Sequence, residues 1–355
     1  MRRAVITTTI YRPDNLLDWG RHMRRDDIMV VAGDIGTPHD EVREVLSFVS
    51  DMADVATLYT VTNDTRTSRV VPMRSIQRRN VAVLEAVRLG ADMITTVDTD
   101  NFPLADHRQN VGFGHLDSIE ELLTKPWRGD LIGSSSGWAN AGEWCDPPVL
   151  HRGWPLGIPS DPVLHSHSLD DIMIGVHASL WLGDPDITAL ERLLDDPTVT
   201  GVPDDCVALE PGVWCPFNSQ ATTFRRELFP LLNVWPGVDR MDDIWPSYVA
   251  RHIMDHLGYL VAYGAPNVRQ ERHQHDIVTD LEKEIIGYRH TGVFLDVLSA
   301  IDLAGVDNAL DCLEEVLTAL DASRQLTDVI PDVTRKFWKA WVADLRDIAV
   351  EEINQ

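Results

Sequence analysis

Short apolar runs alternate with helical patterns along the first hundred residues of the chain. Four runs of apolar and β-branched residues have the length and composition of buried strands: residues 4–10, 28–32, 56–61 and 93–97. The segments between them repeat apolar residues at helical spacing, and the last of these helices is expected to end at Gly90, because glycine commonly terminates helices. Strands that alternate with helices predict an α/β protein with a parallel sheet covered by helices.

The rest of the chain divides into an irregular middle and a helical end. Residues 102–215 are rich in Gly, Pro, Trp and His and show no sustained period, which is typical of loops that build or cover a site. A further strand and turn are expected at residues 213–223, a helix at residues 245–257 and another strand at residues 259–263. From residue 281 the apolar residues recur at helical spacing. We therefore expect a catalytic domain at residues 1–280 and a helical extension at residues 281–355, which is also a candidate homo-oligomer interface.

Composition adds a strongly acidic surface. The chain of 355 residues has 31 basic and 56 acidic side chains, a formal net charge of −25, which argues against binding to nucleic acid or to anionic membranes. No apolar run approaches the roughly 18 residues of a membrane span, and the N-terminus lacks the apolar core of a signal peptide. The four cysteines have no CxxC spacing and suggest neither a zinc site nor a disulfide framework. We expect a cytoplasmic protein.

Two carboxylates follow the fourth predicted strand. Asp98 and Asp100 are two residues apart, so on an extended chain both side chains point the same way, beyond the carboxyl end of the sheet. Ligands bind at this edge in open α/β sheets, and paired carboxylates suit Mn²⁺ or Mg²⁺ holding a diphosphate. His273 and His275 lie in a later polar loop, and either could complete the coordination. The alternative is an ordinary turn in which Asp and Asn residues cap a strand.

Other polar residues near the first strands could bind a nucleotide. The chain contains neither GxGxxG nor GxxxxGK[ST], so ordinary NAD binding and P-loop phosphate binding are unsupported. Arginines that begin the helix before Gly90 could donate two hydrogen bonds each to phosphate, although a solvated helix face explains them nearly as well. The predicted nucleotide contacts are Thr8, Thr9, Arg12, Asp34, Arg74, Arg78, Arg79, Asp98 and Thr99.

Polar groups later in the chain suggest a sugar site. Asn218, Ser219 and Gln220 are suited to hydrogen bonds with sugar hydroxyl groups. Asp242 and Asp243 precede a predicted helix, where acidic residues complement the helix dipole; they could equally bind a sugar or act as a base.

Several motifs resemble the plant reversibly glycosylated polypeptides, the UDP-arabinopyranose mutases. The similar segments lie, in the same order, within residues 4–290; the most similar are residues 152–156 (RGWPL), 176–182 (VHASLWL) and 240–245 (RMDDIW). The triplet Asp98-Thr99-Asp100 falls where that family has three aspartates, so the middle acid is missing here. Residues 216–220 (PFNSQ) also resemble STELLO-type proteins. Both groups imply a GT-A glycosyltransferase-like fold, a Rossmann-like mixed sheet flanked by helices.

The resemblance implies a flavin-independent mutase that interconverts the pyranose and furanose forms of a nucleotide sugar. A GDP-linked hexose, as in the bacterial GDP-L-galactose mutase type, is favoured as substrate, with UDP-arabinose next. Arg152 matches the family's glycosylated arginine, and we favour an electrostatic role for it. Asp242, Asp243 and His177 would handle sugar hydroxyls and protons, with Trp154 in the sugar site. Two alternatives are a metal-dependent glycosyltransferase that uses an acceptor and a non-catalytic nucleotide-sugar-binding protein.

Overall fold

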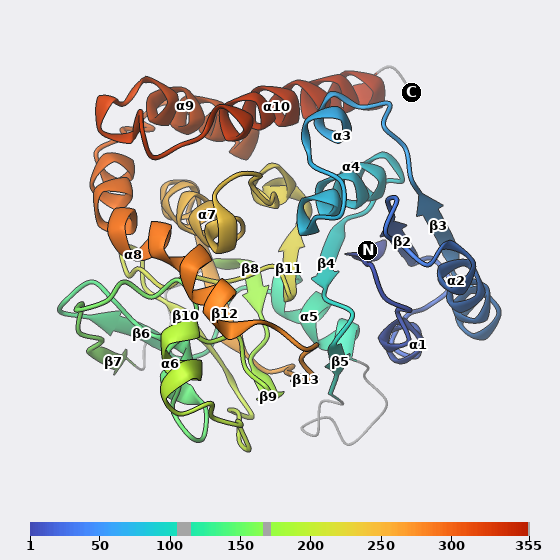
Figure 1. Cartoon of the computed structure of the whole chain (residues 1–355), viewed down its shortest axis with the longest axis horizontal. Coiled ribbons are helices and arrows are strands. Elements are labelled where there is room, and N and C mark those ends of the chain that lie inside the picture. Colours follow the sequence, from blue (N-terminus) through green and yellow to red (C-terminus); the bar gives the residue numbers. More distant parts are fainter. Residues whose placement is uncertain (105–114, 166–171, 354–355) are drawn as a thin grey trace.

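A computed structural model describes residues 1–104, 115–165 and 172–353 of the chain (Figure 1). In these residues ten strands form one sheet in the order β3-β2-β1-β4-β11-β8-β12-β10-β6-β7. Its strands are β1 Arg3–Thr8, β2 Ile28–Ala32, β3 Ala56–Thr60, β4 Met93–Val97, β6 Leu131–Ser134, β7 Pro162–His165, β8 Met173–Ala178, β10 Cys206–Leu209, β11 Ala221–Arg225 and β12 Tyr259–Gly264. A second, three-stranded sheet contains β5 Asn101–Pro103, β13 Val268–Gln270 and β9 Trp181–Gly183.

Strands β3, β2, β1 and β4 are all parallel, as their alternation with helices predicts. Strands β2 and β4 have the predicted bounds, and each consists of five fully buried residues. Beyond β4 the sheet becomes mixed, because β11 pairs antiparallel with both β4 and β8. The predicted α/β architecture, a mixed sheet flanked by helices, is confirmed.

The helices cover the sheet and extend beyond one edge of it (Figure 1). They are α1 Asn15–Gly20, α2 His39–Ala53, α3 Arg66–Val70, α4 Arg79–Arg88, α5 His115–Thr124, α6 Ala189–Leu194, α7 Ile244–Leu257, α8 Ile277–Ser299, α9 Ala309–Ala322 and α10 Asp332–Ile353. Helix α4 packs on β1 and β2, whereas α7 packs on β12. Gly90, just beyond α4, has a φ of 74°, which a glycine adopts at little cost. None of the helices in the described ranges has a long enough apolar stretch to cross a membrane.

The segment before β11 is a loop and not the start of a strand. We expected a strand and a turn at residues 213–223, but the strand comes last: β11 begins only at Ala221 and continues to Arg225. Pro216 has no N–H for a sheet ladder. The side chains of Asn218 and Ser219 are hydrogen-bonded to Asp186 and Asp243, which holds this loop at the end of the strand.

The C-terminal helices share one continuous hydrophobic core with the sheet. Helix α8 begins at Ile277, where the Asp276 carboxylate accepts hydrogen bonds from the amides of Val278 and Thr279 and caps the helix. Helices α9 and α10 follow along the upper edge in Figure 1 and pack on α7 and on α3 and α4, respectively. The predicted boundary at residues 280 and 281 therefore falls inside α8, and the division into two domains stays a prediction.

Candidate functional site

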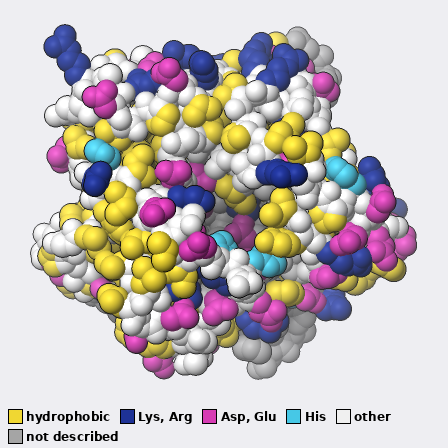
Figure 2. Space-filling model, in the orientation of Figure 1, with side chains coloured by type: hydrophobic (Ala, Val, Ile, Leu, Met, Phe, Trp, Pro, Cys, Tyr) yellow, Lys and Arg dark blue, Asp and Glu magenta, His cyan; other side chains and the backbone are white. Residues whose placement is uncertain are grey.

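A pocket of about 220 Å³ lies at the carboxyl ends of β1, β2 and β4. Its walls include Thr8, Thr9, Asp34, Arg74, Asp98, Thr99, Asp100, His273 and His275, all of which are predicted site residues. The pocket forms here because parallel strands all present their carboxyl ends at the same edge of the sheet. Figure 2 shows a hollow near the middle of this face, where acidic, basic and histidine side chains gather.

Asp98 and Asp100 both line the pocket, as their spacing predicts. The Asn101 amide donates a hydrogen bond to Asp100 Oδ1 at 2.8 Å, and the buried Arg79 guanidinium pairs with Asp98. Burial, and then the charge of Asp98, raises the pKa of Asp100 to about 6. A cation bound between the two carboxylates would favour the ionised form of both.

The donor set fits Mn²⁺ or Mg²⁺ only if a ligand supplies further oxygens. In the described ranges no three His, Cys, Asp or Glu side chains converge as a metal site would require. His273 stacks on Tyr11 with 4.1 Å between ring centroids, and His275 Nδ1 lies 3.4 Å from Asp280. Magnesium-type sites commonly use one or two carboxylates and complete their shell with substrate phosphates and water. Asp98 and Asp100 suit that arrangement, with the histidines at the pocket wall.

The four predicted phosphate-binding arginines have different environments. Arg74 lines the pocket, and within the described chain its guanidinium has no hydrogen-bond or ion-pair partner. Its backbone, at φ 54°, is held by a hydrogen bond from its amide to Asp34. Arg12 is on the surface and pairs with Asp14 and Glu44. Arg74 is therefore the arginine placed to meet a phosphate.

Arg78 and Arg79 are buried and serve the protein itself. Arg78 donates to the backbone oxygen of Thr62 at 2.9 Å and to Asn63 Oδ1 at 3.1 Å, so the structure does not bring it to the pocket. Arg79 pairs with Asp98 and donates to both oxygens of Ser219 at 2.6 Å. Arg79 therefore connects the pocket to a second cluster of polar residues.

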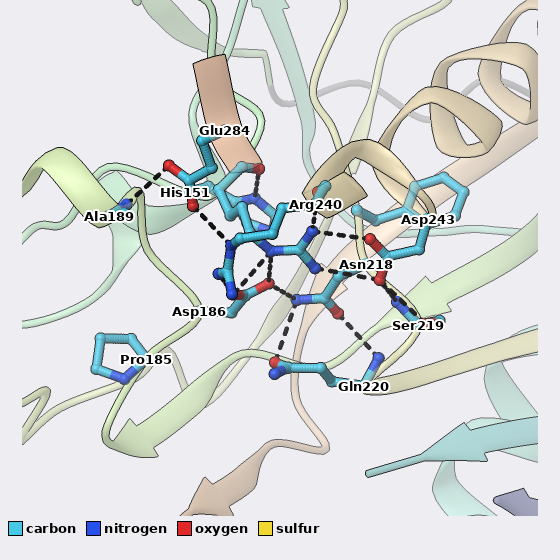
Figure 3. A network of polar contacts seen from close by, with 12 residues as sticks. His151, Pro185, Asp186, Ala189, Asn218, Ser219, Gln220, Arg240, Asp243 and Glu284 are labelled. Carbon is cyan, nitrogen blue, oxygen red and sulfur yellow. Dashed lines mark hydrogen bonds and ion pairs between the residues drawn. The ribbon is translucent and has the colours of Figure 1, made fainter. Parts of the chain in front are cut away.

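Arg152 belongs to that second cluster, of which Asp186, Asn218 and Asp243 are labelled in Figure 3. Its Nε lies 2.9 Å from both carboxylate oxygens of Asp186, and its Nη1 lies 2.9 Å from Asp243 Oδ1. The Arg152 amide also donates to the Asp186 carbonyl at 3.0 Å, which places the two segments side by side. Burial would lower the pKa of Arg152, but Asp186 and Asp243 raise it well above its usual value. The guanidinium is fixed and permanently charged.

Asp242 and Asp243 share this cluster, although they differ in charge state. Burial acts to raise the pKa of Asp243, but the charge and hydrogen bonds of Arg152 outweigh burial and lower it. Asp243 also accepts from the Ser219 hydroxyl at 3.0 Å and makes no capping hydrogen bond to α7. For Asp242, burial and then the charge of Asp243 raise the pKa to about 7. A carboxyl group with a pKa near neutrality can both release and accept a proton.

The two amide side chains that were predicted to bind the sugar, Asn218 and Gln220, are hydrogen-bonded to each other beside Asp186. Asn218 donates to Asp186 at 2.8 Å and to Gln220 Oε1 at 3.2 Å (Figure 3). Ser219 links Asp243 to Arg79, so the loop before β11 joins both clusters. The structure thus brings together Arg152, both aspartates and this loop, next to the pocket.

His177, a predicted catalytic residue, and Trp154, predicted for the sugar site, are both buried. His177 is fully buried on β8, where its Nε2 donates to the carbonyls of Gly264 and Ala265, and burial lowers its pKa to about 4. Trp154 is buried, and its indole donates to the Ile158 carbonyl at 3.3 Å. Neither side chain is among the residues that line the pocket, and both pack into the core.

Several polar partners were missed from the sequence. Asp186 holds Arg152, and Gln77 donates to Asp242 at 2.6 Å. From α8, Glu284 pairs with Arg240 at 2.9 Å, and the Arg240 carbonyl accepts a hydrogen bond from Arg152 (Figure 3). Asp186 and Glu284 both lie within residues 4–290, where the chain resembles the mutase family, and this was the available signal. The helical end of the chain thus supports the Arg152 cluster.

Replacing Asp242 by asparagine should stabilise the protein at alkaline pH. An aspartate with an unfolded pKa near 4 and a folded pKa of about 7 binds more protons when folded, so stability falls as pH rises between these values. The amide should remove this loss and add roughly 1–3 kcal/mol at pH 8. Gln77 can turn its amide to accept the new N–H, and Asp243 N can still donate to the remaining oxygen.

Urea unfolding at pH 8 and at pH 5 measures this difference. The gain should be present at pH 8 and small at pH 5, and the exposed Asp296→Asn on α8 serves as the matched control. Equal destabilisation of Asp242→Asn at both pH values would contradict this and show that Asp242 is ionised in the folded protein and stabilised by Arg152 and Arg240.

The chain is similar in sequence to two plant proteins, although no family model matches it. It is 25% identical over 195 residues to probable UDP-arabinopyranose mutase 1 of Pisum sativum, which covers 53% of this chain and 49% of that protein. It is 27% identical over 201 residues to probable UDP-arabinopyranose mutase 4 of Arabidopsis thaliana, covering 54% and 50%. The chain therefore spans about half the length of the curated relatives it matches.

Two solved structures of S. aureus TarS are distantly similar to this chain. One has a TM-score of 0.38 and 11% identity, covering 98% of this chain and 54% of TarS. The other, TarS 1–349 in complex with UDP, has a TM-score of 0.38 and 10% identity, covering 100% and 92%. At this level of similarity the TarS structures say nothing about the function of this chain.

Proposed function

We propose that this protein is a metal-dependent, flavin-independent nucleotide-sugar mutase on a GT-A-like fold. Its reaction interconverts the pyranose and furanose forms of a nucleotide sugar, with a GDP-linked hexose favoured and UDP-arabinose next. The relatives named UDP-arabinopyranose mutases support the reaction class.

The position of Arg152 carries this proposal. Its guanidinium is fixed by Asp186 and Asp243, and a continuous set of contacts through Ser219 and Arg79 leads from there to Asp98 in the pocket. A nucleotide diphosphate in the pocket would thus direct its sugar toward Arg152. This arrangement suits chemistry at the bond between sugar and diphosphate.

Asp98 and Asp100 would hold a divalent cation together with the diphosphate. Such a cation stabilises the negative charge that develops on the diphosphate as the anomeric C–O bond breaks. Arg74, whose guanidinium has no hydrogen-bond or ion-pair partner among the described residues, would bind a phosphate oxygen from the pocket wall. Asp34 and the threonines at the end of β1, which line the same pocket, would contact the nucleoside.

The Arg152 cluster would handle the sugar after the bond breaks. A different hydroxyl group of the sugar would attack C1 and lose its proton, the bond from C1 to the original ring oxygen would break as that oxygen gains a proton, and the retained diphosphate would then attack C1 again. Asp242, with its pKa near neutrality, would accept the proton from the attacking hydroxyl and return it to the oxygen that leaves the ring. Arg152 would act through its charge, because a guanidinium paired with two carboxylates keeps its proton and is a poor nucleophile.

Incubation with Mn²⁺ and a panel of GDP- and UDP-sugars, without any acceptor, tests this function. We expect one of these nucleotide sugars to give a new isomer of the same mass, separable by chromatography and assigned by NMR. Slow hydrolysis to nucleoside diphosphate and free sugar, with no isomer, would instead indicate a glycosyltransferase that lacks its acceptor.

A further inference from the structure

A regular charge pattern runs along one face of α10. Arg335, Lys339, Ala343, Asp347 and Glu351 are spaced four residues apart and so form one ridge of the helix. The two basic residues come first, the two acidic residues come last, and the small alanine lies in the middle. Lys339, Asp347 and Glu351 are exposed, whereas Arg335 and Ala343 are half-buried.

This order of charges is unfavourable for a helix by itself. Like charges four residues apart repel each other, and basic residues near the start with acidic residues near the end oppose the helix dipole. Contacts within the chain offset only part of this cost: Asp321 is shared by Arg335 and Lys339, and Arg66 pairs with Asp347. In the described chain Glu351 has no basic partner. Among the described residues, one positive charge in the first half of the ridge and one negative charge in its second half therefore lack an opposite charge.

We propose that a second copy of the chain balances them, with α10 packing antiparallel on α10 about a two-fold axis at Ala343. A two-fold interface brings positions equally far from the axis together. Lys339 lies four residues before Ala343 and Asp347 four residues after it, so each lysine faces the partner's aspartate. Arg335 and Glu351, eight residues on either side, form the outer pair. The small side chain of Ala343 allows the two helices to approach closely where they cross.

The surface beside this ridge is hollowed. A groove of about 560 Å³ lies between α9 and α10, and Leu317, Trp338 and Val342 are among its lining residues. Charged side chains form much of the rest of its lining. The upper edge of the molecule in Figure 2, where α9 and α10 lie, shows a concentration of basic side chains that contrasts with the net charge of −25. At physiological salt the screening length is about 8 Å, so repulsion between distant charges is weakened while paired charges still interact.

Sedimentation equilibrium of the full chain at 0.15 M NaCl tests this interface. We expect a monomer–dimer equilibrium, with a dissociation constant that rises at least tenfold in Lys339→Glu and in Asp347→Lys. The double variant should return to within about threefold of the unmodified protein, because it restores opposite charges across the axis. Lys339→Glu loses the intramolecular contact to Asp321, and Asp347→Lys loses the contact to Arg66. The double variant loses both contacts, so they cannot explain its recovery. Lys283→Glu, an equal change on the exposed face of α8, should have no effect.

A second measurement does not depend on charge. Ala343→Cys places a thiol on the axis, so mild oxidation should give a covalent dimer, whereas Lys283→Cys should not. A chain that stays monomeric at all concentrations, a double variant as weak as the single variants, or no cross-linking through position 343 would each overturn the interface. The outcome is independent of the proposed mutase reaction.

Discussion

Arg152→Ala should lower the free energy of unfolding by about 3–5 kcal/mol, the cost usual for breaking a buried ion pair. The arginine is the direct partner of two buried carboxylates, on Asp186 and Asp243, and lies within 3 Å of each. Without it, both carboxylates would remain away from water with only neutral hydrogen-bond donors and the more distant Arg240. Urea unfolding at pH 7 measures the loss.

The pH dependence of this loss identifies its cause. Arg152 lowers the folded-state pKa values of both aspartates, so the stability it provides is fully present above an unfolded pKa near 4 and decreases as pH falls. Without Arg152, burial would raise the pKa of both aspartates, so in the variant these carboxylates take up protons as pH falls and the difference between the two proteins should shrink from pH 7 toward pH 4. Arg12→Ala, which breaks an exposed contact with Glu44, should leave the unfolding midpoint almost unchanged. A small and pH-independent loss in Arg152→Ala would contradict the ion-pair network.

Asp100→Asn should reduce turnover by about 100-fold or more while the protein stays folded. The amide keeps the shape of the carboxylate but removes one of the two negative charges that would hold the cation. Folding should be preserved because ionised Asp100 is itself costly: burial and the neighbouring Asp98 raise its pKa to about 6. The measurement is the initial rate of isomer formation at saturating Mn²⁺.

The control for this substitution is Asp40→Asn, which alters an exposed carboxylate on α2. It should leave the rate unchanged. If Asp100→Asn retained normal turnover at every Mn²⁺ concentration, Asp100 would have no part in the chemistry. A protein that lost turnover and also lost its cooperative unfolding transition would instead assign Asp100 to folding.

The parts of the fold with a strong local signal were predictable. Every residue of strands β2 and β4 is apolar or β-branched. This pattern predicts strands that are buried on both faces, and it also predicts where they begin and end. The pair Asp98 and Asp100 lines the pocket because the end of β4 fixes where the chain emerges. Short strands such as β6 and β10 lie in the region read as irregular, since four residues carry too little periodicity and tertiary pairing decides their state.

The partners of the predicted residues were less predictable. Arg78 and Arg79 are neighbours in the sequence, yet one binds backbone carbonyls and the other binds Asp98, because a 3-10 turn passes into α4 at this point. His177 seemed suited to acid–base work, but its position on a central strand buries it. Gln77 gave no signal at all, since its contact with Asp242 joins segments 165 residues apart. Long-range pairings of this kind depend on the assembled fold.

Isothermal titration calorimetry with Mn²⁺ tests the central claim, that the carboxylates after β4 hold a cation together with a nucleotide. Mn²⁺ should bind with one site per chain in the presence of UDP or GDP, and much more weakly without nucleotide, because the protein alone offers too few ligands. Asp100→Asn should remove the nucleotide-dependent heat beyond that of Mn²⁺ and nucleotide in buffer. No heat beyond that same control with the unmodified protein and either nucleotide would contradict the account.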